Sequence, residues 1–172
     1  TTSGAPESPQ PVPLENEPSA QNLFVLLNHN TYLVANAFGD IEPGAVGLFH
    51  HDNRLLSVYH LNVAGHRPSL LSASVSQDNV YFVSHLTNNP LPLLGEETTP
   101  QGVIHIERKR FLWEERMFEC ISLFNYSDQP SLLPINLHFG GDFRDMFEVR
   151  GQNRPLRGTL TEPQVFKQGV VV

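Results

Sequence analysis

Short apolar runs with a two-residue period constrain the fold of this chain most strongly. From residue 23 onward these runs alternate with clusters of Gly, Pro, Asn, Asp and Ser. Their spacing of roughly 8–12 residues is typical of the strands of a β-sandwich. No stretch keeps the 3.6-residue period of a helix for three turns. The sequence therefore predicts an all-β domain, an antiparallel two-sheet β-sandwich of the supersandwich-like type, over residues 23–172.

The individual strands follow from the same pattern. Residues 23–28 and 31–36 predict a hairpin, and a long loop is expected at 87–102. Alternation predicts that Leu71, Ala73 and Val75 share one face of a strand. Further strands are expected at 55–64, 69–76, 80–86, 103–113, 118–126 and 132–139. In the last of these, Leu133, Ile135, Leu137 and Phe139 should face one way, and Pro134 should lie at an edge or bulge.

The two ends of the chain differ from this pattern. Residues 1–22 contain five prolines and three glutamates but almost no apolar side chains. Such a segment buries too little surface to offset its ordering entropy, so we expect a disordered N-terminal segment there. A proline-rich recognition motif is the alternative. Residues 166–172 resemble the start of a strand, which suggests the N-terminal part of a longer chain.

Composition excludes several classes of partner. The chain has 172 residues, a net charge of −7 and a pI near 5.5, which argues against nucleic acid or an anionic membrane surface. No apolar run approaches the roughly 20 residues of a membrane helix, and no signal peptide is apparent. We therefore expect a cytoplasmic protein. The single Cys120 excludes an internal disulfide, and its neighbours suggest a small core residue.

The histidines show no recognisable metal-site spacing. His50 and His51 are neighbours, and neighbours on a strand point to opposite faces, so one ion would not easily reach both without a turn. Structural or polar surface histidines are favoured over ligands. The chain also lacks a nucleophile elbow, a phosphate-binding glycine loop and a dinucleotide fingerprint. The sequence predicts no metal, no cofactor and no catalytic residue in this chain.

Two groups of residues are candidates for contacts with sugar. Asp142, Asp145 and Glu148 lie close together, although interleaved arginines favour mutual ion pairing over a Ca²⁺ site or an acid/base pair. Trp113 has acidic and basic neighbours, the combination with which carbohydrate sites stack and hydrogen-bond sugars. A core tryptophan with a charged rim is the favoured interpretation of Trp113.

Several motifs in order resemble one family. They lie at residues 47–57, 68–75, 110–113 with 123–127, and 142–151. Together they are similar to the N-terminal domain of bacterial glycogen debranching enzymes of the amylo-α-1,6-glucosidase type, over about residues 22–165. The family pattern Asp-Thr-Arg stands here as Asp52-Asn53-Arg54, a mild substitution because both central residues bond neighbouring backbone. By this resemblance Asp52, Arg54 and Arg150 are also family-motif positions.

The resemblance implies a sandwich that precedes a helical toroid in the same polypeptide. The toroid would carry the catalytic carboxylates of an α-glucan hydrolase of α-glucosidase type. We expect the sandwich alone to be no enzyme and the longer protein to act on an α-glucan or oligosaccharide. Two alternatives remain: a stand-alone carbohydrate-binding module using Trp113 and surface aromatics, and a sandwich that self-associates through unpaired edges.

Overall fold

A computed structural model describes residues 22–91, 99–156, 158–159, 161–162, 164–167 and 169–171. The predicted disordered segment, apart from Asn22, and residues 92–98 of the predicted loop at 87–102 lie outside these ranges. Among the described residues, no helix has the length and apolar character needed to span a lipid bilayer. The elements are β1 (Leu23–Asn28), β2 (Thr31–Asn36), β3 (Gly47–His50), β4 (Asn53–Leu56), β5 (Val58–Val63), β6 (Ser69–Val75), β7 (Tyr81–Thr87), β8 (Ile104–Trp113), β9 (Arg116–Asn125), β10 (Ile135–Gly140), α1 (Met146–Val149), β11 (Gln164–Phe166) and β12 (Gly169–Val171).

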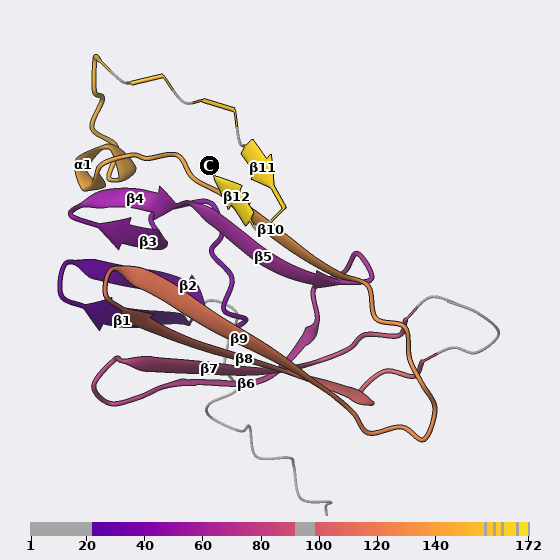
Figure 1. The fold of residues 1–172 in the computed structure, drawn as a ribbon. Coiled ribbons are helices and arrows are strands. Elements are labelled where there is room, and N and C mark those ends of the chain that lie inside the picture. The colour runs from indigo at the N-terminus through magenta and orange to yellow at the C-terminus, as the bar shows by residue number, and fades with distance from the viewer. Residues whose placement is uncertain are drawn as a thin grey trace, which may run out of the picture.

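The strands form a layered, antiparallel arrangement (Figure 1). One layer is the four-stranded sheet β6-β7-β8-β9. The facing layer consists of the four-stranded sheet β1-β2-β3-β4 and the two-stranded sheet β5-β10, and β11 and β12 form a separate hairpin. The prediction of an all-β antiparallel sandwich is confirmed. The hairpin predicted at 23–28 and 31–36 is also confirmed, with β1 and β2 at those bounds.

Two apolar clusters join the layers. The first packs Leu26 and Leu33 of β1 and β2 against Phe82 of β7. The second packs Leu61 of β5 against Ile106 of β8. Both clusters include inward-facing residues of β8, where alternate positions are buried. Burial of these side chains removes apolar surface from water and is the main force that holds the layers together.

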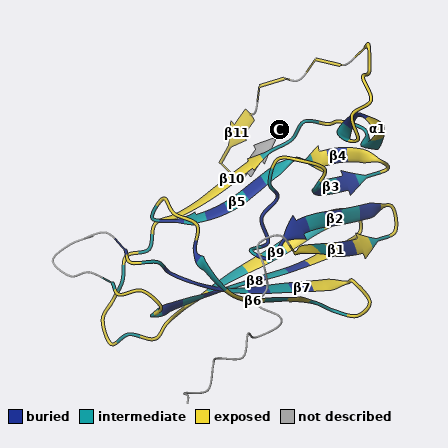
Figure 2. Cartoon of the chain, turned by 180° about the vertical axis from the view of Figure 1, so that it is seen from behind, coloured by how far each residue is buried: buried dark blue, intermediate teal, exposed yellow. Residues whose placement is uncertain are grey.

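The apolar side chains on one face of β10 are only partly buried. Ile135, Leu137 and Phe139 share a face, as predicted, but they are 38%, 45% and 44% exposed. Their cross-strand partners on β5, including Leu61, are buried. Figure 2 shows the difference along the two strands, dark blue on β5 and yellow on β10. Pro134 precedes the strand, and its carbonyl accepts a hydrogen bond from Ala64 N.

Other local predictions were wrong. The register of β6 shifts between Leu70 and Ser72, so Leu71 is exposed whereas Ala73 packs against the core. The bulge breaks the alternation that put Leu71 and Ala73 on one face. Cys120 is exposed because it lies on the outer face of β9, not in the core. The strand predicted at 55–64 is divided at Ser57 into β4 and β5.

Candidate functional site

Two motifs that are far apart in the sequence lie side by side. The segment before α1 runs antiparallel to the start of β4, with a bridge between Asn53 and Asp145. Arg54 N donates to the carbonyl of Arg144 at 2.7 Å, and Met146 N donates to the carbonyl of Asp52 at 2.8 Å. The residues at 52–54 therefore form one site with the acidic residues at 142–148.

An ion pair holds this site together. Arg54 Nε donates to Asp142 Oδ1 at 3.0 Å, and Arg54 Nη2 donates to Asp142 Oδ2. The other terminal nitrogen of Arg54 donates to the carbonyls of Gly44 and Val46. Arg54 is 5% exposed, so these bonds satisfy a buried guanidinium. Partial burial acts to raise the pKa of Asp142, but the bond and charge of Arg54 outweigh it and hold that pKa below its usual value.

Two glycines allow the close approach that this pair needs. A Cβ on Gly141 would lie 2.5 Å from the Leu55 carbonyl oxygen. A Cβ on Gly47 would lie 2.7 Å from Arg54 Cδ, and Gly47 also has a φ of +154°. No L side chain fits at either position without a backbone shift.

Asp145 and Glu148 form a capping box on α1. Asp145 Oδ1 accepts from Glu148 N at 2.8 Å, and Glu148 Oε2 accepts from Asp145 N at 3.1 Å. Asp145 also accepts from Arg154 at 3.2 Å, and Arg150 is the C-terminal cap residue of the helix. These reciprocal bonds satisfy backbone donors at the start of the helix. The acidic residues of this segment thus make internal contacts, as the interleaved arginines suggested.

Solvent-accessible hollows flank the ion pair. One, of about 290 Å³, is lined by Asp142, Phe143, Glu148 and Arg154. The other, of about 480 Å³, is lined by Arg54, Ser57 and Asp142 among others. Asp142 lines both hollows and separates one from the other. The two hollows expose polar groups that a ligand could contact. The carboxylates, however, are bonded to Arg54 and to the backbone at the start of α1.

Trp113 lies elsewhere, at the end of β8, and is 57% exposed. The favoured interpretation of a core tryptophan was wrong, since Trp113 is at the exposed tip of the β8–β9 hairpin and pairs with Arg116. Its strand neighbour on the same face, Phe111, is also exposed. The structure therefore leaves the Trp113 ring available for contacts with a ligand or another domain.

Rows of stacked rings cross the outer face of the β6–β9 sheet. Phe111 stacks between Tyr81 and Phe118, with ring-centre distances of 6.3 and 5.0 Å and nearly parallel planes. Further along, His105 stacks between His85 and Phe124 at 5.1 and 5.7 Å. Cross-strand pairing places most of these rings directly opposite one another, and His85 lies diagonally across from His105. We call this surface the aromatic face; it consists of Tyr81, His85, His105, Phe111, Trp113, Phe118 and Phe124.

A buried charge network lies between the two apolar clusters. Glu119 Oε1 accepts from Arg108 Nε at 2.8 Å and from Arg110 Nε at 2.9 Å, and Tyr59 donates to Glu119 Oε2. Arg108 also donates to Asp40 Oδ1 at 2.6 Å. Both guanidinium groups are fully buried. The network links β8 and β9 to β5 through charge-assisted bonds.

Burial and charge shift the pKa values in this network. Burial, followed by the charge of Glu119, raises the pKa of Tyr59 to about 12. Burial and the neighbouring charge of Arg108 lower the pKa of Arg110 to about 10. For Glu119, burial acts in the opposite sense, but Arg110 and Arg108 keep its pKa below the usual value. The carboxylate is thus the common acceptor for two cations.

Sequence reasoning did not identify this network. The available signal was alternation along 104–112, which puts Arg108 and Arg110 on the same face as Ile104, Ile106 and Leu112. Two arginines on an apolar face indicate a buried partner, but nothing in the sequence identified Glu119 or Asp40 as that partner.

Comparison with known proteins decides the family. The family described as the N-terminal domain of some glycogen debranching enzymes matches residues 26–172. The chain belongs to this family. The debranching-enzyme match covers both the Arg54–Asp142 site and the aromatic face, and extends the resemblance found in the sequence to residue 172. No curated protein matches the chain at a significant level.

Proposed function

We propose that this chain is the non-catalytic N-terminal β-sandwich domain of a glycogen debranching enzyme of the amylo-α-1,6-glucosidase type. In this proposal it supports α-glucan hydrolysis by a downstream helical-toroid domain. The family match supports the enzyme context. We also propose a cytoplasmic location, because glycogen is an intracellular glucan.

The acidic side chains of the candidate site are bonded to other groups of the domain, and this supports the non-catalytic assignment. Glycoside hydrolysis requires two carboxylates on opposite sides of the scissile bond, about 5–10 Å apart. Here Asp142 is bound to Arg54, and Asp145 and Glu148 cap a helix turn. A carboxyl group whose pKa is held low, such as Asp142, is also unsuited to act as a general acid.

The exposed apolar stripe on β10 supports contact with a further domain. Leu137 and Phe139 are each more than two-fifths exposed, yet their cross-strand partners on β5 are buried. Docking of a helical domain over this stripe would remove the apolar surface from water. Self-association over the same stripe is the alternative, and concentration-dependent dimerisation of the chain, measured by sedimentation, would favour it.

The coding sequence past Val172 tests this proposal. Several hundred further residues of helical pattern, with acidic residues in the connections between helices, are the expected result. A stop codon directly after Val172 would contradict the proposed downstream domain.

The aromatic face supports a second candidate function, carbohydrate binding by the sandwich itself. The exposed ring of Trp113, on the same face of the β6–β9 sheet as the stacked rings of Phe111 and Phe118, resembles the flat apolar platforms on which the C–H faces of sugars stack. Glu107 and Lys109 lie on the same face and offer polar groups to hydroxyls. Calorimetric titration of the chain with malto-oligosaccharide distinguishes this function from a purely structural one.

A further inference from the structure

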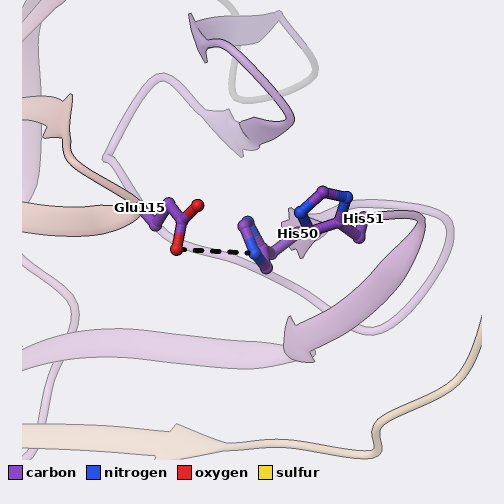
Figure 3. Close-up of side chains that lie close together, drawn as sticks. All are labelled: His50, His51 and Glu115. Atoms are coloured by element: carbon purple, nitrogen blue, oxygen red, sulfur yellow. Dashed lines mark ion pairs between the residues drawn. The ribbon is translucent and has the colours of Figure 1, made fainter.

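Two tight hairpin turns from different layers bring three potential metal ligands together (Figure 3). His50 ends β3, and His51 begins the β3–β4 turn with a φ of 44°. Glu115 occupies the β8–β9 turn with a φ of 63°. One ligand atom of each residue lies within 4.8 Å of the others. Because His51 has left the strand, the two imidazole rings do not point to opposite faces; their centres are 4.3 Å apart.

We propose that His50, His51 and Glu115 bind a divalent transition-metal ion of the zinc type. Two imidazole nitrogens and one carboxylate oxygen form a common zinc donor set. Ca²⁺ and Mg²⁺ prefer oxygen ligands throughout, so the two histidines disfavour them. This site does not depend on the proposed function.

The orientation of His50 supports ligation through Nε2. His50 Nδ1 lies 2.8 Å from the hydroxyl of Thr31, which is 1% exposed. A hydrogen bond at one ring nitrogen is the usual way in which proteins orient a metal-binding histidine. It directs Nε2 toward Glu115, whose Oε2 is 3.8 Å away. Two ligands of one zinc ion lie about 3–4 Å apart, so this separation is compatible with a shared ion.

The other two ligands are free to complete the geometry. The Glu115 side chain is 70% exposed, and His51 is also exposed, so each can rotate by the small amount that coordination needs. Water can enter at the fourth position of a tetrahedral ion. The bound ion would join the β3–β4 turn to the β8–β9 turn, two residues from Trp113.

Isothermal titration of the metal-free chain with Zn²⁺ near neutral pH tests the proposal. We expect one ion per chain, and at least about tenfold weaker binding for His51→Asn and for Glu115→Gln. Asparagine tolerates the left-handed conformation of residue 51. Glu114→Gln in the same turn and His66→Asn in another exposed turn are the matched controls, and both should bind as the unaltered chain does.

Trp113, the only tryptophan, provides a second measurement. Co²⁺ should quench its fluorescence in a saturable manner in the unaltered chain and in the controls, but not in Glu115→Gln. Zn²⁺ should also raise the Tm of the chain, since an ion that binds only the folded state stabilises it. Absence of saturable binding, or equal affinity in Glu115→Gln and Glu114→Gln, would overturn the proposal and leave a histidine–carboxylate ion pair. If His51→Asn fails to fold, the comparison of the two glutamate variants decides alone.

Discussion

Arg54 and Asp142 are 88 residues apart in the sequence and form a two-bond ion pair at the centre of the candidate site. This contact attaches the segment before α1 to β4. The segment also pairs with β4 through backbone bonds, so the ion pair and these bonds together hold α1 in place. Arg54, Asp142, Asp145 and Glu148 therefore make contacts that serve the architecture of the domain.

Asp142→Ala should destabilise the domain by about 2–3 kcal/mol, because it leaves the buried Arg54 guanidinium without its carboxylate. Urea denaturation measures the loss. Asp128→Ala, at an exposed position in a turn, is the control and should change the free energy of unfolding by less than about 0.5 kcal/mol. Equal stability of the two variants would contradict a structural role for Asp142.

The same pair should make stability depend on acid pH. Arg54 holds the pKa of Asp142 below its usual value, so the folded state loses its proton more readily than the unfolded state. The stabilisation is then complete above about pH 4 and declines as pH falls further. The difference in unfolding free energy between the unaltered chain and Asp142→Ala should be larger at about pH 7 than at about pH 3.

Glu119→Gln should destabilise the domain more severely, by about 3–5 kcal/mol, because two buried arginines share this carboxylate. Glu114→Gln makes the same chemical change at the exposed tip of the β8–β9 hairpin and should have almost no effect. Thermal unfolding of the two variants provides the comparison. A Glu119→Gln variant as stable as Glu114→Gln would show that the network does not hold the layers together.

Tyr59 should lose its proton only at strongly alkaline pH. Its pKa is raised to about 12 by burial and by Glu119, so the folded state binds this proton more tightly than the unfolded state. The stabilisation is complete below about pH 10 and is lost as pH rises toward 12. Tyr59→Phe should remove the late step of an ultraviolet absorbance titration, and Tyr126→Phe, at an exposed ring, should leave it in place.

Trp113→Ala should change stability by less than about 1 kcal/mol, because the ring is more than half exposed. If the aromatic face binds sugar, the same variant should weaken malto-oligosaccharide binding severalfold. Phe147→Ala on α1, which removes another exposed ring, is the matched control for both measurements. A large drop in Tm with unchanged sugar affinity would assign Trp113 to structure.

The sequence predicted the fold better than it predicted the site. Alternation gave most strand positions and the sandwich class, because one face of each strand is buried in the core. It failed at Leu71, where a bulge changes the register. The core interpretation of Trp113 was wrong for another reason, because Trp113 lies on the outer face of β8 next to the buried Leu112. Pairings such as Arg54 with Asp142 depend on how remote segments meet, and local patterns do not contain that information.

The central claim is that this domain contributes to glucan processing without performing the chemistry. The direct test is glucose release from a branched limit dextrin by the purified chain, compared with a mock preparation. The account predicts no release above the mock. Release at a clearly higher rate, abolished by Asp142→Asn or Glu148→Gln, would contradict it and make the acidic residues beside α1 catalytic.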